Sequence, residues 1–300
     1  MSEPAFNLDP FEDFESASQA VVGFLRMHLG FKLLMVTRTQ GDDWIVLHAS
    51  DGGYGIDRGE VFQWTDTLCA KMIAGDGPRV APRIADVPVY AESPLAQMAP
   101  LGSYIGVPLI NADGSLFGTL CAVDPEPRED DLERQLPLVE VLARLLSSVL
   151  NRDLELIELR RRVEQTARKA MQDPVTGLLD LDGWHEVLNN EEARAAGYGT
   201  PMSVFGIELG ASFDAGIDAS QKDLELARAG GILRVILRES DILARTGPTL
   251  LAVLGVDCDR DAAERVRGNI EMALTGGSLD AEVVCTQRVP KEGLRVEVQT

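Results

Sequence analysis

The stretch RESDILARTGPTLLAVLG, residues 238–255, sets an arginine and an aspartate just ahead of a predicted β-hairpin. Arg238 and Asp241 stand at the corner where a predicted helix meets a strand. Together they offer a planar donor fork and a carboxylate acceptor side by side, which suits ligand binding. The hairpin tip holds Gly247 and Pro248 and has no reactive side chain beside them. What this pair does ahead of an unreactive hairpin tip therefore depends on what the rest of the chain resembles.

A purely structural alternative explains the same pair. Asp241 would then cap the turn, and Arg238 would be a solvated cation at the negative end of the helix dipole. Arg234 and Arg245 lie close by in the sequence and could assist in holding an anion, although Arg245 could equally be structural. The residues alone leave both alternatives open.

Composition restricts the possible classes of partner. The 300 residues are enough for two domains, and the 45% hydrophobic fraction can build sizeable cores. The formal net charge of −20 disfavours nucleic-acid polymers and anionic membranes, so a phosphate-bearing ligand would need a local arginine cluster. The acidic amino terminus lacks the apolar core of a signal peptide. The apolar run 20–36 is interrupted by Arg26, His28 and Lys32, so no membrane span and a cytoplasmic location are expected.

Cysteine and histidine usage predicts no metal site and no bound cofactor. The three histidines do not pair at ligand spacing. The four cysteines are widely spaced without a C-x-x-C, which indicates free thiols in a reducing compartment. They are Cys69, Cys121, Cys258 and Cys285.

Hydrophobic periodicity in the first half alternates between helix and strand patterns. An Asp-Gly turn between two apolar runs is a strong hairpin signal around residues 111–114. The predicted elements are a helix over 11–29, strands over 31–39 and 44–50, a helix over 65–75, a strand over 79–87 and hairpin strands over 104–110 and 116–124.

A long helix is predicted over 136–172, before Pro174. Its apolar residues follow alternating steps of three and four, which is a heptad ladder. A single buried amphipathic helix explains 136–150 but not the later, mostly charged part, so we favour a parallel dimeric coiled coil. Arg152 and Thr166 would be weak, register-setting positions. The predicted seam consists of Leu142, Leu145, Val149, Leu156, Leu159 and Val163.

Helices and strands alternate again after residue 175, which predicts a second domain with a mixed sheet. The expected fold class is α/β (α+β), with two mixed-sheet domains joined by the long helix. The predicted parts are a sensor-like domain over 10–150, the linking helix over 136–172 and a second domain over 173–300.

The segment SYIGVPLINADGSLFGTLCAVDPEPRED, residues 103–130, resembles the core of a GAF domain, with its G-x-P-L strand, D-G turn and G-T-L strand. The resemblance covers about residues 10–150 and implies a small-molecule sensor or a dimerisation module. The family's ligand chemistry does not transfer to these residues, and neither Cys69 nor Cys121 can be assigned as a tetrapyrrole attachment site.

The segment DPVTGLLDLDGW, residues 173–184, is similar to the opening signature of GGDEF domains, the diguanylate cyclases of bacterial signalling. Further along, Arg238, Asp241 and Arg245 align with the family's R-x-x-D-x-x-x-R. The GGDEF positions themselves are then Gly247, Pro248, Thr249, Leu250 and Leu251.

This resemblance implies a dismantled catalytic site, with no catalytic residue retained. Phosphoryl transfer between two GTP molecules needs carboxylates that hold divalent metal, and neither Thr249 nor Leu250 can supply one. Pro248 removes an N–H and stiffens a turn where the family has glycine. Glu208 could retain one carboxylate of the other metal-bearing strand. The family's final helix also has no counterpart before residue 300.

The surviving R-x-x-D matches the family's inhibitory site, where it implies binding of cyclic di-GMP by Arg238 and Asp241, with Arg234 assisting. The receptor hypothesis competes with a dimeric scaffold that engages a partner protein without nucleotide. A GTP-binding regulator with residual activity is a third possibility, which the substituted signature argues against.

Overall fold

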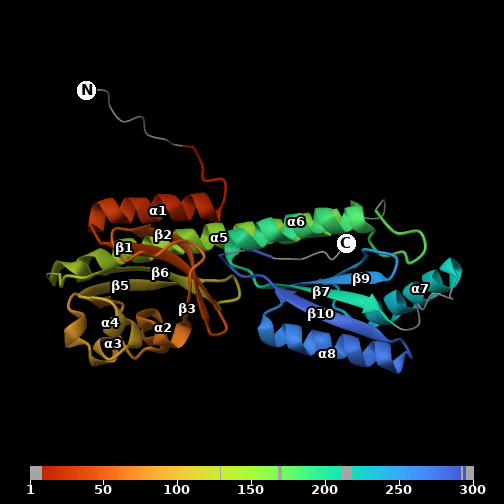
Figure 1. Cartoon of the computed structure of the whole chain (residues 1–300). Coiled ribbons are helices and arrows are strands. Elements are labelled where there is room, and N and C mark those ends of the chain that lie inside the picture. Colours follow the sequence, from red (N-terminus) through yellow and green to blue (C-terminus); the bar gives the residue numbers. More distant parts are fainter. Residues whose placement is uncertain (1–8, 129, 168–170, 211–217, 292, 295–300) are drawn as a thin grey trace. The chain divides into compact units, whose positions relative to one another are not determined.

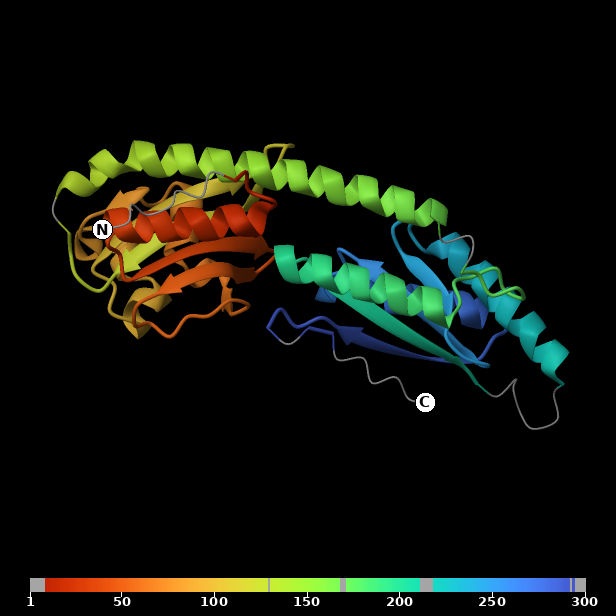
Figure 2. The same cartoon turned by 90° about the horizontal axis from the view of Figure 1, so that it is seen from above.

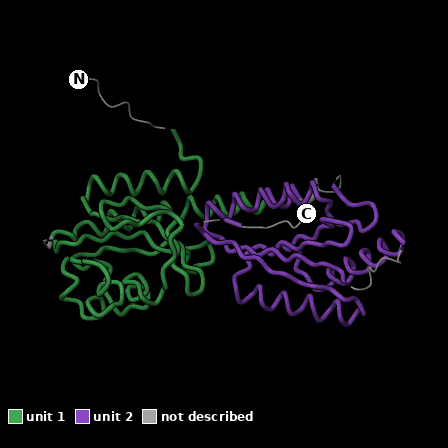
Figure 3. The backbone as a smooth tube through the Cα atoms, viewed as in Figure 1, with its two compact units in different colours: residues 1–159 green, residues 160–300 purple. Residues whose placement is uncertain are grey.

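The computed structural model places the chain in two compact units, residues 1–159 and 160–300 (Figure 3). The helix α5, Leu136–Ala167, contributes residues to both units. The described residues are 9–128, 130–167, 171–210, 218–291 and 293–294.

The first unit is built on a six-stranded antiparallel sheet with strand order β3-β2-β1-β6-β5-β4. Its strands are β1 (Leu33–Gln40), β2 (Asp43–Asp51), β3 (Val61–Gln63), β4 (Val80–Ala81), β5 (Ser103–Ile110) and β6 (Leu116–Asp124).

Helices cover both faces of this sheet. α1 (Phe14–Leu29) and the first part of α5 lie on one face, whereas α2 (Leu68–Ala74), α3 (Pro88–Ala91) and α4 (Pro94–Met98) lie on the other (Figures 1 and 2). Because strand side chains alternate between faces, Met35, Tyr104 and Cys121 enter the core beneath α2 to α4.

Local sequence signals explain most of these boundaries. The Asp13 side chain caps α1 with a reciprocal bond to Ser16, and Gly30 ends the helix in the left-handed conformation at φ 66°. Gly114, at φ 86°, closes the predicted β5–β6 hairpin. The predicted first helix and the predicted β5–β6 hairpin are therefore confirmed.

The strand predicted over 79–87 is wrong beyond its first residues. Only Val80–Ala81 pairs with the sheet, and residues 84–86 form a 3-10 turn. Pro82 has no N–H to give the ladder, which stops the strand there. The Pro-containing stretch that follows contains α3 and α4, which begin with Pro88 and Pro94 at their first helical position.

The second unit has a four-stranded antiparallel sheet with order β10-β7-β9-β8. α7 and α8 pack on one face, and α6 packs on the other (Figure 1). Its elements are α6 (Leu181–Tyr198), β7 (Met202–Leu209), α7 (Ala219–Ile236), β8 (Ile242–Arg245), β9 (Leu250–Val256), α8 (Arg260–Gly276) and β10 (Ala281–Gln287).

The predicted fold class is confirmed: two α+β units share a long helix. The sheets are not mixed as expected, because all pairings between the named strands are antiparallel. A parallel bridge joins Leu179 to Ala244 outside those pairings. Among the described residues, no helix is long and apolar enough to cross a membrane.

Candidate functional site

The predicted corner joins α7 to β8 and is closed by its own two residues. The Asp241 Oδ2 atom accepts a 2.9 Å hydrogen bond from the backbone N–H of Arg238, and the Asp241 N–H donates to the Arg238 carbonyl over 3.1 Å. Arg238 is exposed, and within the described part of the chain its guanidinium makes no hydrogen bond or ion pair. The donor fork is therefore available to a ligand.

The carboxylate of Asp241 is partly withdrawn from water. Burial raises the pKa of Asp241, and this outweighs the lowering by the N–H and the charge of Arg238. A desolvated acceptor next to a free guanidinium suits a ligand that carries both donors and acceptors.

Arg234 has a different environment from the other two predicted ligand residues. It lies in the last turn of α7, and its Nη2 donates to the Gly177 carbonyl over 2.5 Å. Gly177 adopts φ 63° within the D-P-V-T-G turn, so the contact ties α7 to that turn. The structure brings Arg238 and Asp241 together and gives Arg234 a backbone partner.

Asp173 organises the same turn. Its Oδ1 accepts from the Thr176 N–H at 2.8 Å and from the Thr176 hydroxyl at 2.7 Å, and Arg245 Nη1 lies 3.4 Å away. Burial raises the pKa of Asp173, but the Thr176 and Arg245 contacts outweigh burial and lower it. Arg245 also forms an ion pair with Asp223 at 2.8 Å, so its guanidinium bridges Asp173 and Asp223 and has a structural role.

The five signature positions lie at the tip of the β8–β9 hairpin and the start of β9. The turn is closed by bonds from the N–H groups of Thr246 and Gly247 to the Leu250 carbonyl, at 3.0 and 3.3 Å. Pro248 is exposed, and Leu251 is buried in the core beneath α7 and α8. The Thr249 carbonyl accepts from the Leu209 N–H over 3.0 Å.

Glu208 on β7 stands opposite Leu250 on β9 and is exposed. A carboxylate at position 250 would stand across the strand pair from Glu208, where two metal ligands could approach each other. A leucine there offers no ligand. Within the described ranges, no group of three or more histidine, cysteine, aspartate or glutamate residues could hold a metal ion. The following loop, residues 211–217, lies outside the described residues.

α5 presents two different stripes. Val139, Ala143, Leu146 and Leu150 are buried against the first unit. The predicted seam lies on other positions and is largely exposed, which leaves an apolar surface uncovered in one chain. The exposed fractions are 57% for Leu145, 39% for Leu156, 49% for Leu159 and 71% for Val163, whereas Leu142 and Val149 are half-buried. The Thr166 side chain is outside the described part.

A buried charge network in the second unit was not anticipated from the sequence. Glu191 on α6 is 2% exposed and accepts from Arg161 of α5 at 2.7 Å and from Arg194 of α6 at 2.5 Å. Arg194 also bonds Glu164 of α5 at 2.5 Å. The Glu191–Arg194 spacing of three residues along a helix was the available signal.

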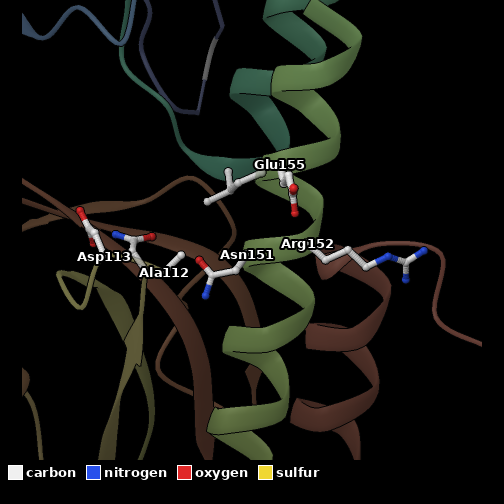
Figure 4. A pocket seen from close by; sticks show the side chains of 7 residues that line it. Ala112, Asp113, Asn151, Arg152 and Glu155 are labelled. Carbon is white, nitrogen blue, oxygen red and sulfur yellow. The ribbon is translucent and has the colours of Figure 1, made fainter.

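A groove of about 630 Å³ lies beside the β5–β6 hairpin tip in the first unit (Figure 4). Its polar side chains are largely engaged with neighbouring groups: Asn151 donates to the Ile110 carbonyl, and Asp113 accepts from Ser115. Figure 4 shows Arg152 extending away from the hairpin residues. The groove therefore lacks the convergent polar groups of a specific ligand site.

Comparison with known proteins decides the nature of the first unit. Residues 13–150 match the family described as GAF domain. Residues 13–150 form a GAF domain. The G-x-P-L motif of this GAF domain lies on β5 and its G-T-L motif on β6, as the resemblance implied.

The chain is also similar to solved structures of GGDEF domains. The FimX GGDEF domain from Pseudomonas aeruginosa has 21% identity and a TM-score of 0.38, covering 41% of this chain and 83% of that one. The coiled coil and GGDEF domain of DgcB from Caulobacter crescentus, in complex with c-di-GMP, has 18% identity and a TM-score of 0.38, covering 55% and 86%.

One curated relative matches a short part of the chain. It is a cyclic di-GMP phosphodiesterase of Pseudomonas aeruginosa, 39% identical over 83 residues. The match covers 27% of this chain and 14% of that protein, so the chain spans about one seventh of the relative's length.

Proposed function

We propose that this protein is a cyclic di-GMP receptor whose second unit is a GGDEF-type domain that has lost nucleotide synthesis. The carrying observation is the corner between α7 and β8, where a free guanidinium lies beside a desolvated carboxylate. The D-P-V-T-G turn and the R-x-x-D spacing support the relationship to GGDEF domains through the sequence.

The corner can recognise a guanine nucleotide with the two side chains in distinct roles. The Arg238 fork would donate two parallel hydrogen bonds to guanine O6 and N7, or to a phosphate. Asp241 uses Oδ2 for the turn and would accept from the guanine N1–H and exocyclic amine through Oδ1. Arg234 would add positive charge from the preceding helical turn.

Loss of synthesis follows from the residues at the hairpin. The proposed ancestor would hold a metal-bound triphosphate with carboxylates at the hairpin tip and on β7. Here Leu250 faces Glu208, and Pro248 and Thr249 occupy the tip. A single carboxylate leaves a divalent cation without a second protein ligand in this strand pair. For the same reason, a GTP-binding regulator with residual turnover is disfavoured.

Dimerisation belongs to the same proposal. The exposed seam of α5 would pair with the same seam of a second chain in a parallel coiled coil. α5 begins within the GAF domain and its last residues belong to the second unit, so a change in the packing of this helix would pass from one unit to the other.

A dimeric scaffold that engages a partner protein is the second candidate. It is favoured by the fact that Arg238 and Asp241 already satisfy each other's backbone through the turn. In this case the corner needs no nucleotide, and the surfaces of the second unit would serve a partner.

Calorimetric titration of the variant Arg238→Ala separates the two candidates. The matched control is Arg265→Ala, because Arg265 is an exposed arginine of the same unit on α8. The receptor hypothesis predicts that Arg238→Ala raises the Kd for cyclic di-GMP roughly 100-fold, since a bidentate charged contact is worth about 1–3 kcal/mol. Arg265→Ala should retain the parent affinity. Equal affinities of the two variants for cyclic di-GMP would contradict the receptor hypothesis.

A further inference from the structure

The helix α1 and the first part of α5 lie side by side on one face of the GAF-domain sheet (Figure 2). The start of α1 is fixed to α5, because the Phe14 N–H donates to the buried Asp153 carboxylate. The end of α1 lies at the start of α5, where the His28 ring nitrogen Nε2 is 3.2 Å from Gln135 Oε1. The two helices therefore run antiparallel, and the last turns of α1 are level with the first turns of α5.

The exposed apolar side chains of α1 lie on its flank toward α5. Phe24 stacks on His28, with ring centroids 5.6 Å apart, and His28 is the residue that contacts the start of α5. The opposite flank faces β2, where Arg26 donates to the Ser50 carbonyl over 2.9 Å. Met27 follows Phe24 by three residues on the same stripe, and the two are 83% and 44% exposed.

The flank of α5 next to α1 carries the start of the proposed seam. Asp153 marks the side on which α1 lies, and Leu142 and Val149 are separated from it by nearly whole numbers of helical turns. They therefore point to the same side. On the other flank, Asn151 donates to the Ile110 carbonyl at the end of β5. The seam of α5 and the stripe of α1 adjoin and form one apolar surface.

We propose that the GAF domain docks in parallel onto the GAF domain of a second copy of this chain through this joint face of α1 and α5. The joint face consists of Phe24, Met27, Leu142, Leu145 and Val149. The inference rests on the proposed pairing of α5 and extends it from one helix to two. A second chain that follows the seam into the GAF domain meets the α1 stripe beside it. Met27 and Leu145, largely exposed in one chain, would lose contact with water there, which supplies a hydrophobic driving force.

Two exposed charges on α5 indicate a second copy in parallel orientation. With Leu156 at heptad position a, Glu155 is at position g and Arg160 is at position e. Within the described residues, neither charged side chain makes a hydrogen bond or an ion pair. In a parallel dimer, the g residue of one helix meets the e residue of the next heptad on the other helix. Glu155 of each chain would therefore meet Arg160 of the other, so opposite charges pair on both flanks of the seam.

Sedimentation equilibrium of the full-length chain tests the joint face with the variant Met27→Lys. The matched control is Met98→Lys, because Met98 is 82% exposed on α4, which lies on the opposite face of the same sheet. We expect Met27→Lys to raise the dimer dissociation constant at least about tenfold, since it would bury a lysine charge in an apolar interface. Met98→Lys should keep the parent constant. The circular dichroism of both variants should match the parent, because neither methionine is part of the core.

The charge pair provides a second measurement, which also reports the orientation. Glu155→Arg should weaken the dimer at least about threefold, because like charges would then meet on both flanks. The double variant Glu155→Arg with Arg160→Glu places opposite charges together again in a parallel dimer. It should return the dissociation constant to the parent value.

The outcomes separate this inference from the proposed function. If Met27→Lys dimerises like the parent while Leu156→Lys with Leu159→Lys gives monomers, the coiled coil stands and the joint face is wrong. If the parent chain is a monomer at every concentration, both the coiled coil and the joint face are wrong. Equal weakening by Met27→Lys and Met98→Lys, or a Glu155→Arg defect that the double variant does not relieve, also overturns the parallel docking.

Discussion

Replacing Glu191 by glutamine tests the buried network that holds α5 against α6. The side chain keeps its shape, but its charge is lost while Arg161 and Arg194 stay in place. Each hydrogen bond to a charged group contributes about 1.5–3 kcal/mol, and breaking a buried pair costs about 3–5 kcal/mol. Glutamine retains one acceptor oxygen, so we expect the unfolding free energy of the second unit to fall by about 3 kcal/mol.

Hydrogen exchange followed by mass spectrometry over residues 181–198 measures this loss. A decrease of about 3 kcal/mol corresponds to roughly a hundredfold lower protection of α6 where exchange requires opening of the whole unit. The matched control is Glu264→Gln, which breaks the Arg267–Glu264 pair on α8, with exposed fractions of 41% and 62%. That exposed pair should change protection by less than about threefold.

Similar protection in both variants would refute this reasoning. It would mean that Glu191 contributes no more than a surface carboxylate, and that α5 is held to α6 by other contacts.

Three further predictions address other parts of the molecule. Gly118→Ala should lower the unfolding free energy of the GAF domain by at least about 3 kcal/mol in urea titrations, because the new Cβ would lie 1.8 Å from a backbone carbonyl oxygen of β1. The control is Gly23→Ala on α1, where a Cβ would have nothing within 4 Å. This variant should be neutral or stabilising by up to about 1 kcal/mol. The pKa of Asp173 is lowered from 3.8, so its contribution to stability is fully present above the unfolded pKa and is lost as pH falls through the folded pKa. Urea midpoints measured against pH should therefore fall less steeply on the acid side in Asp173→Asn than in the parent protein. An equally steep acid-side fall would contradict the stabilising role of the Asp173 carboxylate. The double variant Leu156→Lys with Leu159→Lys should sediment as a monomer with an unchanged circular dichroism spectrum. A persistent dimer would exclude α5 as the dimer interface.

Elements governed by local chemistry could be predicted from the sequence. The Asp-Gly turn at 113–114 sets the β5–β6 hairpin, and glycine at position 30 ends α1, because each signal acts within a few residues. The strand predicted over 79–87 failed because an apolar run does not distinguish a strand from a short stretch of 3-10 turns and helices. Pro82 was the signal against it.

Part of the candidate site could be predicted from the sequence. The spacing of Arg238 and Asp241 correctly placed them together at one corner, because both lie in one turn. The donor from Tyr104 to Cys69 spans 35 residues, and the Arg161–Glu191 pair spans 30. Such contacts depend on how whole elements pack, and neither residue type nor local period specifies them.

Isothermal titration of the full-length protein with cyclic di-GMP, with GTP plus magnesium as a parallel titration, tests the central claim most directly. The account predicts saturable binding of cyclic di-GMP with a Kd of about 1 µM or tighter, or about −8 kcal/mol, and no turnover of GTP. An absence of cyclic di-GMP binding, or magnesium-dependent consumption of GTP, would contradict a receptor built on an inactive cyclase fold.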